Sequence, residues 1–255
     1  MYPPWVVLHL PHDSTVIPDS VRDQLLLSDD ELDMEIARIT DHHTFDLFAE
    51  AGAQIVRAPV SRLVVDVERF RDDAKEPMSQ KGMGAVYTAT SQMTPLRRTL
   101  CPEEREDLMR TYYDPHHRRL ETAVDRAIES HGRCLVVDCH SFPDNPLPYE
   151  QATSSSVRPD ICIGTDDFHT EESLGSAFIN EFRNAGFTVA VNTPFAGALV
   201  PGSRYRIDRR VQAIMVEINR RLYLRDDKVS VVADFEAVAR TVRLCCIKAT
   251  KIFYQ

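Results

Sequence analysis

The stretch Cys134-Leu-Val-Val-Asp-Cys-His-Ser141 decides the fold, because it contains the most strand-like run in the chain. Its first four residues are apolar without alternation, which is typical of a strand buried on both faces of a sheet. Polar residues follow at once, His140 among them. In open α/β sheets, ligands bind where strands end and loops begin. The stretch therefore predicts a central strand and also where the functional site lies.

Further apolar runs lie on both sides of this strand, and helical patterns separate them. Strands are expected at residues 5–10, 54–59, 63–67, 161–163, 187–191 and 211–222. Helices are expected at 28–52, which starts at the capping box Ser28-Asp-Asp-Glu31, at 102–132, which Pro115 should kink or split, and at 172–184 and 233–253. This alternation predicts one α/β domain, residues 1–255, with a mostly parallel sheet covered by helices.

Composition narrows the class of protein. The 255 residues are 43% hydrophobic, 27% charged and 8% aromatic, the balance of an ordinary globular protein. No run approaches the roughly 20 apolar residues of a membrane span, so no membrane contact is expected. A net charge of -9 disfavours nucleic acid as a partner. The six cysteines form no recognisable disulfide or zinc framework, and no secretory leader is visible, so a cytoplasmic location is expected.

Candidate chemistry gathers just past three apolar runs, at Pro11-His12-Asp13-Ser14, at Asp138-Cys-His140-Ser141 and at Glu217-Ile-Asn-Arg220. Two histidines and a glutamate at strand ends suit a zinc ion with a general base, since imidazole is a common zinc ligand. Glu217 lies in an apolar run, where a glutamate needs a cation such as Arg220 or a role in a site. His9 has an odd offset from His12, so it is expected to point away and to be structural.

Other motifs are weaker or missing. His169-Thr-Glu-Glu172 has the His-x-x-Glu spacing of some zinc sites, but its glutamates are expected to begin a helix, where the dipole favours them. The sequence contains no glycine-rich dinucleotide loop, no phosphate loop and no serine-hydrolase elbow.

An ordered set of short motifs resembles the N-formylglutamate amidohydrolase family over about residues 6 to 225. The motifs are Pro11-His12, Thr40-Asp41, Val65-Asp-Val-Glu-Arg69, Gly82-Met-Gly-Ala-Val-Tyr87, Tyr113-Asp-Pro-His-His117, Val137-Asp-Cys-His-Ser141, Asn192-Thr-Pro-Phe-Ala-Gly197 and Val216-Glu-Ile-Asn-Arg-Arg-Leu-Tyr223. The resemblance implies a fold similar to zinc carboxypeptidases, with a mixed sheet and a metal at the strand ends. It also implies hydrolysis of an N-acyl amino acid, typically N-formyl-L-glutamate, in histidine breakdown.

The same resemblance assigns roles to individual residues. One Zn²⁺ per chain would be held by His12, His140 and a carboxylate, with Asp41 as the expected third ligand and Asp13 and Asp66 as alternatives. Glu217 would be the general base that moves a proton from water to the leaving nitrogen. The residues expected to bind the substrate are Arg69, Arg71, Arg204 and His117, with Arg69 the best of the arginines.

One departure from the family bears on the substrate. The family's Asp-x-Asn-Arg block is Asp66-Val-Glu68-Arg69 in this chain, and an extra acid near the pocket disfavours a substrate with two carboxylates. The expected partner is therefore a small N-acyl amino acid, either N-formyl-L-glutamate or a relative. A carboxypeptidase-like peptidase and a catalytically silent binding protein on the same fold are the alternatives, and the oligomeric state is left open.

Overall fold

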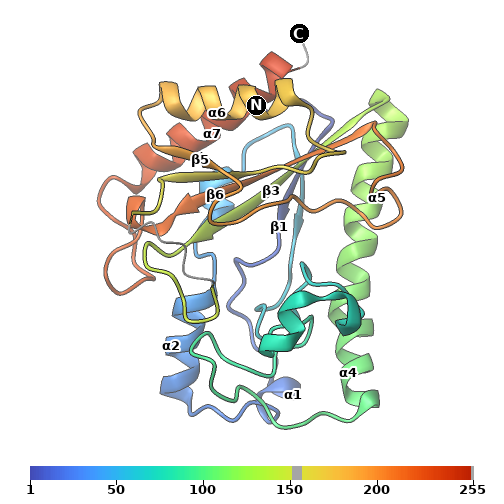
Figure 1. Cartoon of the computed structure of the whole chain (residues 1–255), viewed down its shortest axis with the longest axis vertical. Helices are drawn as coiled ribbons and strands as arrows, with labels where there is room; N and C mark the ends of the chain where they lie inside the picture. Colours follow the sequence, from blue (N-terminus) through green and yellow to red (C-terminus); the bar gives the residue numbers. More distant parts are fainter. Residues whose placement is uncertain (151–156, 254–255) are drawn as a thin grey trace.

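The computed structural model describes residues 1–150 and 157–253, which build a six-stranded mixed sheet flanked by helices (Figure 1). The strands are β1 (Val6–Leu10), β2 (Gln54–Arg57), β3 (Cys134–Phe142), β4 (Ile161–Gly164), β5 (Val189–Val191) and β6 (Val211–Asn219). Their order is β2-β1-β3-β6-β4-β5. Neighbours pair in parallel except β4 and β6, which are antiparallel. The predicted α/β class with a mostly parallel, mixed sheet is confirmed.

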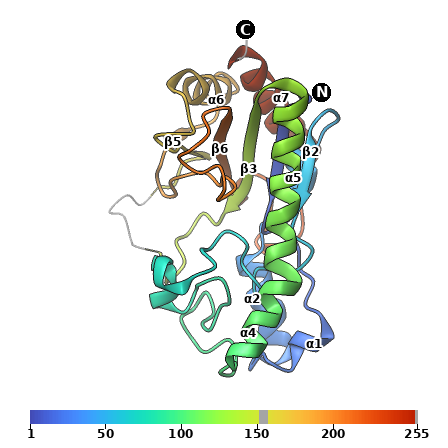
Figure 2. The same cartoon turned by 90° about the vertical axis from the view of Figure 1, so that its right-hand side faces the viewer.

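Helices cover both faces of this sheet. The helices are α1 (Asp19–Arg22), α2 (Asp29–Ile39), α3 (Thr44–Phe48), α4 (Pro102–Leu108), α5 (Asp114–His131), α6 (Glu172–Asn184) and α7 (Phe235–Phe253). Helices α6 and α7 pack on the face that carries Leu8 and Val137, and α5 packs on the face that carries Val7 and Val136 (Figures 1 and 2). None of the helices in the described part of the chain has the length and apolarity needed to span a membrane.

The longest predicted helices are interrupted. Pro115 lies at the start of α5, and a π-helical turn, Met109–Tyr113, joins α4 to α5, in agreement with the expected split. The helix expected at 28–52 begins at its capping box but ends at Ile39, and α3 starts only after His43, which has a left-handed φ of 62°. Residues 40–43 form the break, and the backbone N–H of Asp41 donates to the His12 carbonyl at 2.9 Å. The break therefore holds Asp41 beside the end of β1.

The strand predicted at 63–67 is wrong, because these residues form a buried loop. Val64, Val65 and Val67 pack with Met109 of the π-helical turn rather than pairing with a strand. An apolar run indicates that a segment is buried, but not that it forms a strand. Here the residues are buried in a small hydrophobic cluster beyond the end of the sheet, in the lower half of Figure 1. The loop carries residues 66–69 across the carboxyl ends of β1 and β3, where the candidate site lies.

Candidate active site and metal centre

A cavity of about 650 Å³ lies at the carboxyl ends of β1, β3 and β6. Its polar lining includes residues from the turn after β1, the break after α2, the 62–70 loop and the strands β3 and β6. The polar residues that line it include His12, Asp41, Glu68, Asp138, His140 and Glu217. The two histidines and the glutamate predicted at strand ends are thus brought into one cavity.

Buried carboxylates hold the rings of both histidines, at one nitrogen of His12 and at both nitrogens of His140. His12 Nε2 lies 2.8 Å from Asp66 Oδ1, and His12 Nδ1 is buried with no hydrogen-bond partner among the described residues. His140 Nε2 lies 3.1 Å from Asp138 Oδ1, and its Nδ1 lies 3.1 Å from Asp41 Oδ2. Carboxylates behind imidazoles fix the ring orientation of metal-ligating histidines. When Nε2 carries the ring proton, the unpartnered Nδ1 of His12 offers a lone pair that a metal ion would bind.

The surroundings of these rings favour positive charge. Burial alone lowers the pKa of the His140 imidazole, but Glu68 and Asp138 raise it well above the usual range. The pKa of His12 is also raised, since Asp66 and Asp41 outweigh burial and the charge of Arg62. The carboxylates beside the two rings therefore favour positive charge at this point, and they would also favour a bound divalent cation.

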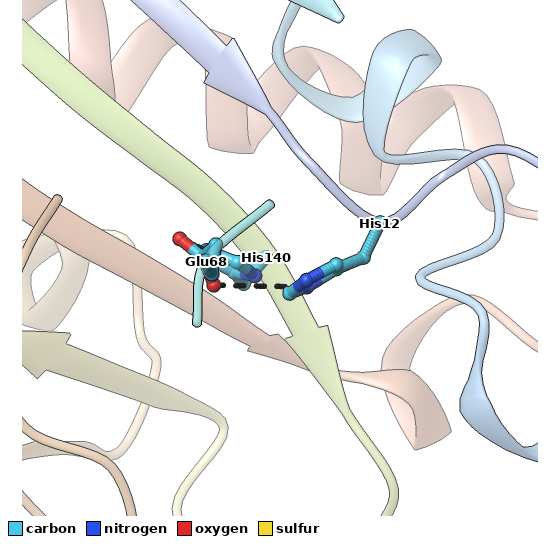
Figure 3. A group of neighbouring side chains, drawn as sticks. All are labelled: His12, Glu68 and His140. Atoms are coloured by element: carbon cyan, nitrogen blue, oxygen red, sulfur yellow. Dashed lines mark hydrogen bonds and ion pairs between the residues drawn. The ribbon is translucent and has the colours of Figure 1, made fainter. Parts of the chain in front are cut away.

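Two carboxylates lie beside both histidines, and of these Glu68, not Asp41, forms a compact donor group with them. Glu68, on the loop over β3, joins His12 and His140 in a compact group whose ligand atoms lie within 4.8 Å of one another (Figure 3). Glu68 Oε1 lies 3.0 Å from His140 Nε2, and its Oε2 lies 3.7 Å from His12 Nδ1. Asp41 Oδ2 lies 3.1 Å from His140 Nδ1 and 3.8 Å from His12 Nδ1. From the sequence, Glu68 was predicted only to be an extra acid near the substrate.

Glu217 lies next to His140 in the β3–β6 register, at the floor of the cavity. Burial raises its pKa to about 8, opposed by His140 and reinforced by Asp41 and Glu68. Its Oε2 is buried with no hydrogen-bond partner among the described residues. Arg220 does not pair with it, because Arg220 donates to Asp41 at 2.8 Å and to Ser141 Oγ at 3.1 Å. A desolvated, unpaired carboxylate in a cavity is the arrangement expected of a general base.

The burial of the Glu217 carboxylate should make the stability of the metal-free protein depend on pH. A group whose pKa is raised in the folded state stabilises the fold below its unfolded pKa of about 4.5, and that stability is lost as the pH rises through about 8. Glu217→Gln should therefore unfold like wild type near pH 5 and be more stable by roughly 2–4 kcal/mol at pH 9. Urea unfolding in the presence of a chelator measures this, with the exposed Glu129→Gln as control. Equal stabilities at pH 9 would contradict the assigned burial cost.

Of the four residues expected to bind the substrate, one lies in the cavity and three lie outside it. Arg69 lines the cavity. His117 lies outside it, where its Nε2 lies 2.8 Å from the Val67 carbonyl and so supports the loop. Arg204 pairs with Asp125 and Asp208, and Arg71 with Asp114 and Glu106, away from the cavity lining. Because surface carboxylates already neutralise the charges of Arg204 and Arg71, we propose no substrate contact for these two arginines.

The alternative metal ligands, Asp13 and Asp66, have other partners. Arg57 Nε donates to Asp13 Oδ1 at 2.8 Å, and Asp13 does not line the cavity. Asp66 is fully buried and accepts from Arg62, from the Tyr87 hydroxyl and from the backbone of Glu68. Asp66 therefore orients His12 from behind.

The prediction that His9 points away from the site is wrong, because His9 Nδ1 lies 3.9 Å from Glu68 Oε1 and His9 supports Asp138 beneath the site. His9 Nδ1 lies 2.7 Å from Asp138 Oδ1, and His9 Nε2 lies 2.8 Å from His116 Nε2 on α5. The other oxygen of Asp138 accepts from the Leu199 backbone at 2.9 Å. Asp138 was visible in the central strand motif, but its link to His9, 129 residues away, carries no local signal. His9, Glu68 and Asp138 also form a second compact donor group.

Comparison with known proteins identifies the family. The family model described as N-formylglutamate amidohydrolase matches residues 5–224. An N-formylglutamate deformylase of Pseudomonas putida is 26% identical over 233 residues, which are 87% of this chain and 82% of the relative. One of the same name from Pseudomonas aeruginosa is 26% identical over 194 residues, 72% of this chain and 71% of the relative.

Solved structures share the fold. The crystal structure of N-formylglutamate amidohydrolase from Ralstonia eutropha JMP134 superposes with a TM-score of 0.84 at 22% identity, over 98% of this chain and 94% of the other. A gene product of Agrobacterium tumefaciens superposes with a TM-score of 0.66 at 20% identity, over 98% and 92% of the two chains. The resemblance drawn from the sequence motifs is confirmed, and with the family model matched over residues 5–224, the chain belongs to the N-formylglutamate amidohydrolase family.

Proposed function

We propose that this chain is a zinc-dependent hydrolase that splits an N-acyl amino acid into a carboxylic acid and the free amino acid. Membership of the family supports amide hydrolysis. The observation that carries the proposal is the meeting, in one cavity, of His12, His140 and the unpaired carboxylate of Glu217. Imidazole and carboxylate donors in a partly buried site suit Zn²⁺, which takes three protein ligands and keeps one position open in catalytic sites.

His12 and His140 are the imidazole ligands in this proposal, and Asp41 is the third ligand. Asp41 Oδ2 lies 3.1 Å from His140 Nδ1 and 3.8 Å from His12 Nδ1, while both Nε2 atoms keep a carboxylate partner, Asp66 or Asp138. Arg220 holds the other oxygen of Asp41, which fixes the orientation of this carboxylate before any cation binds. Glu68 would instead use His140 Nε2, the atom that Asp138 already binds.

Measuring the metal content of two isosteric variants shows whether Asp41 or Glu68 is the third metal ligand. Asp41→Asn is expected to bind zinc at least about tenfold more weakly, because the anionic oxygen is lost. Glu68→Gln is expected to keep one zinc per chain. Asp13→Asn, a buried acid outside the cavity, controls for nonspecific damage. The reverse result, with zinc lost in Glu68→Gln and kept in Asp41→Asn, would move the third ligand to Glu68.

A bound zinc supplies positive charge that lowers the pKa of a water molecule and polarises the acyl oxygen. The chain's own residues supply the proton transfers and the orientation. Glu217 accepts the proton of the attacking water and passes it to the leaving nitrogen, so water adds to the acyl carbon as the amide bond breaks. The buried position of Glu217 supports this role, since a pKa near the working pH suits a group that must both take and give a proton.

Arg69 is proposed to bind the carboxylate of the substrate. Its side chain lines the cavity, and its Nε is buried without a hydrogen-bond partner among the described residues, 3.8 Å from Asp66 Oδ2. A guanidinium can bind a carboxylate through two parallel hydrogen bonds. Arg69→Met should therefore raise KM about 10- to 100-fold.

Steady-state kinetics of the Arg69 variant needs a control of the same type. Arg204→Met removes an arginine whose charge is paired outside the cavity, so it should keep wild-type KM. Arg69→Lys should recover part of the affinity, because it keeps the charge but not the planar fork. An unchanged KM in Arg69→Met would remove Arg69 from the substrate site.

The activity itself is tested by incubating the zinc-loaded protein with a panel of N-formyl and N-acetyl amino acids and measuring release of the free amino group. Release that depends on Glu217 supports the proposal. Release of a C-terminal amino acid from dipeptides, with no action on N-acyl amino acids, would favour a carboxypeptidase-like peptidase instead. No release from any of these compounds would favour a binding protein. Histidine breakdown and a cytoplasmic location remain predictions of the sequence.

A further inference from the structure

A chain of buried polar side chains runs from α5 to the proposed metal centre. His116 of α5 lies against His9 of β1, with 2.8 Å between their Nε2 atoms. His9 Nδ1 lies 2.7 Å from Asp138 Oδ1, and His140 Nε2 lies 3.1 Å from the same oxygen. His9 and His116 are fully buried, and neither of them lines the cavity. The proposed reaction therefore uses neither ring directly.

Two neighbouring strands and one helix bring these groups together. His9 and Asp138 are partners in the parallel register of β1 and β3, and His116 lies on the helix that covers this face of the sheet. Buried polar atoms are nearly always hydrogen-bonded, and both ring nitrogens of His9 have a partner. His116 Nδ1, in contrast, has no partner among the described residues. The one polar contact of the His116 ring is thus the contact to His9.

The proton positions near the metal centre follow from the surroundings of Asp138. Its Oδ1 lies within hydrogen-bond distance of His9 Nδ1 and His140 Nε2, and its Oδ2 accepts from the Leu199 backbone N–H at 2.9 Å. An ionised carboxylate can only accept hydrogen bonds, so both ring nitrogens that face it carry a proton. His140 is then left with a lone pair on Nδ1, the nitrogen that faces Asp41. A neutral imidazole binds a metal through such a lone pair.

We infer that His9 and His116 are positioning residues for the metal centre, which hold Asp138 in the orientation that keeps the proton of His140 on Nε2 and its lone pair on Nδ1. The inference rests on the proposed function, in which His140 binds zinc. Without the donor at His9, the Asp138 carboxylate is free to turn, and the His140 ring loses its fixed orientation. Loss of an outer partner of a metal-ligating histidine typically weakens metal binding about 10- to 100-fold.

Paired amide substitutions at the two positions test this inference. The side-chain nitrogen of asparagine can lie where histidine has Nδ1, and the side-chain nitrogen of glutamine can lie where histidine has Nε2. His9→Asn therefore keeps a donor to Asp138, whereas His9→Gln does not. At position 116 the order is reversed, because His116→Gln keeps a polar group at the Nε2 position and the shorter side chain of His116→Asn does not reach His9.

Zinc affinity, measured by competition with a chromophoric chelator, should follow the position of the amide nitrogen. His9→Asn and His116→Gln are expected to bind zinc within about threefold of wild type, and His9→Gln and His116→Asn at least about tenfold more weakly. Thermal unfolding of the metal-free proteins should instead follow side-chain size, with glutamine better tolerated than asparagine at both positions. The opposite orders at position 9 separate positioning from packing. The exposed His131→Gln is the control and should bind zinc like wild type.

A second measurement uses the unchanged protein and so does not depend on how the variants fold. NMR of the histidine ring nitrogens in an isotope-labelled, zinc-loaded sample shows which nitrogen of each ring carries the proton. The expected result is a protonated Nδ1 in His9 and a protonated Nε2 in His140. A bare Nδ1 in His9 would mean that this ring does not donate to Asp138, and it would overturn the inference.

The outcomes separate this inference from the proposed function. Opposite orders of zinc affinity at positions 9 and 116, with the expected protonated nitrogens, support the inference. Equal affinities in the four variants, or affinities that follow side-chain size at both positions, would overturn it while leaving the zinc site in place. Complete loss of zinc in both variants of His9 would also overturn it, because His9 would then be a ligand. No zinc in the wild type would contradict the proposed metal centre, and the inference would fall with it.

Discussion

Replacing His12 or His140 by alanine is expected to lower kcat/KM for the best N-acyl amino acid by at least about 10³-fold and to abolish stoichiometric zinc binding. Each ring is nearly fully buried and presents a nitrogen to the same cavity, so alanine leaves two ligands where three are needed. Hydrolysis assays and elemental analysis of the same preparations measure both effects. The two losses should appear together because the proposed reaction depends on the bound cation.

A histidine outside the site provides the control for these variants. His131 is exposed at the end of α5, so His131→Ala should keep activity and zinc. Far-UV circular dichroism and thermal unfolding should show that the two site variants are folded. Full activity in folded His140→Ala protein would contradict the proposed site, whatever its metal content.

Replacing Glu217 by glutamine is expected to separate catalysis from metal binding. Glutamine has nearly the same shape but cannot accept a proton, so kcat should fall about 10²- to 10⁴-fold. Zinc content should stay at one per chain, since Glu217 is not among the proposed ligands. The fold should also be retained, because the change removes an unpaired buried carboxylate.

The pattern across three readouts decides the role of Glu217. Lost turnover with zinc and stability retained supports the general base. Loss of zinc together with turnover would make Glu217 a ligand and would overturn its assignment as the base. Turnover within about tenfold of wild type would exclude Glu217 from proton transfer.

Much of the fold could be predicted because its signals are local. The apolar run at Cys134 predicted the central strand, and the helix expected at residues 172–184 matches α6 residue by residue. The capping box at Ser28 marked the start of α2, because capping is satisfied within one turn. The end of α2 was missed, since the break at residues 40–43 depends on contacts to the turn after β1 that no local pattern reports.

The site was less accessible to sequence reasoning, for a physical reason. Polar residues beside strand ends marked His12, His140 and Glu217, which do share one cavity. Arg69 and Arg204 could not be told apart in the sequence, because pairing of Arg204 with Asp125 depends on residues 79 positions apart. Glu68 was noticed as a departure from the family's motif, but only the course of the buried loop shows that it lies over His140. The single-domain organisation remains a prediction.

The most direct test of the central claim is the zinc content of the protein after equilibration with Zn²⁺ and removal of the unbound ion, measured by elemental analysis beside His140→Ala. The proposed site predicts about one zinc per chain in the wild type and much less than one in the variant. No zinc in either protein, or one zinc per chain in both, would contradict a metal centre built on His12 and His140.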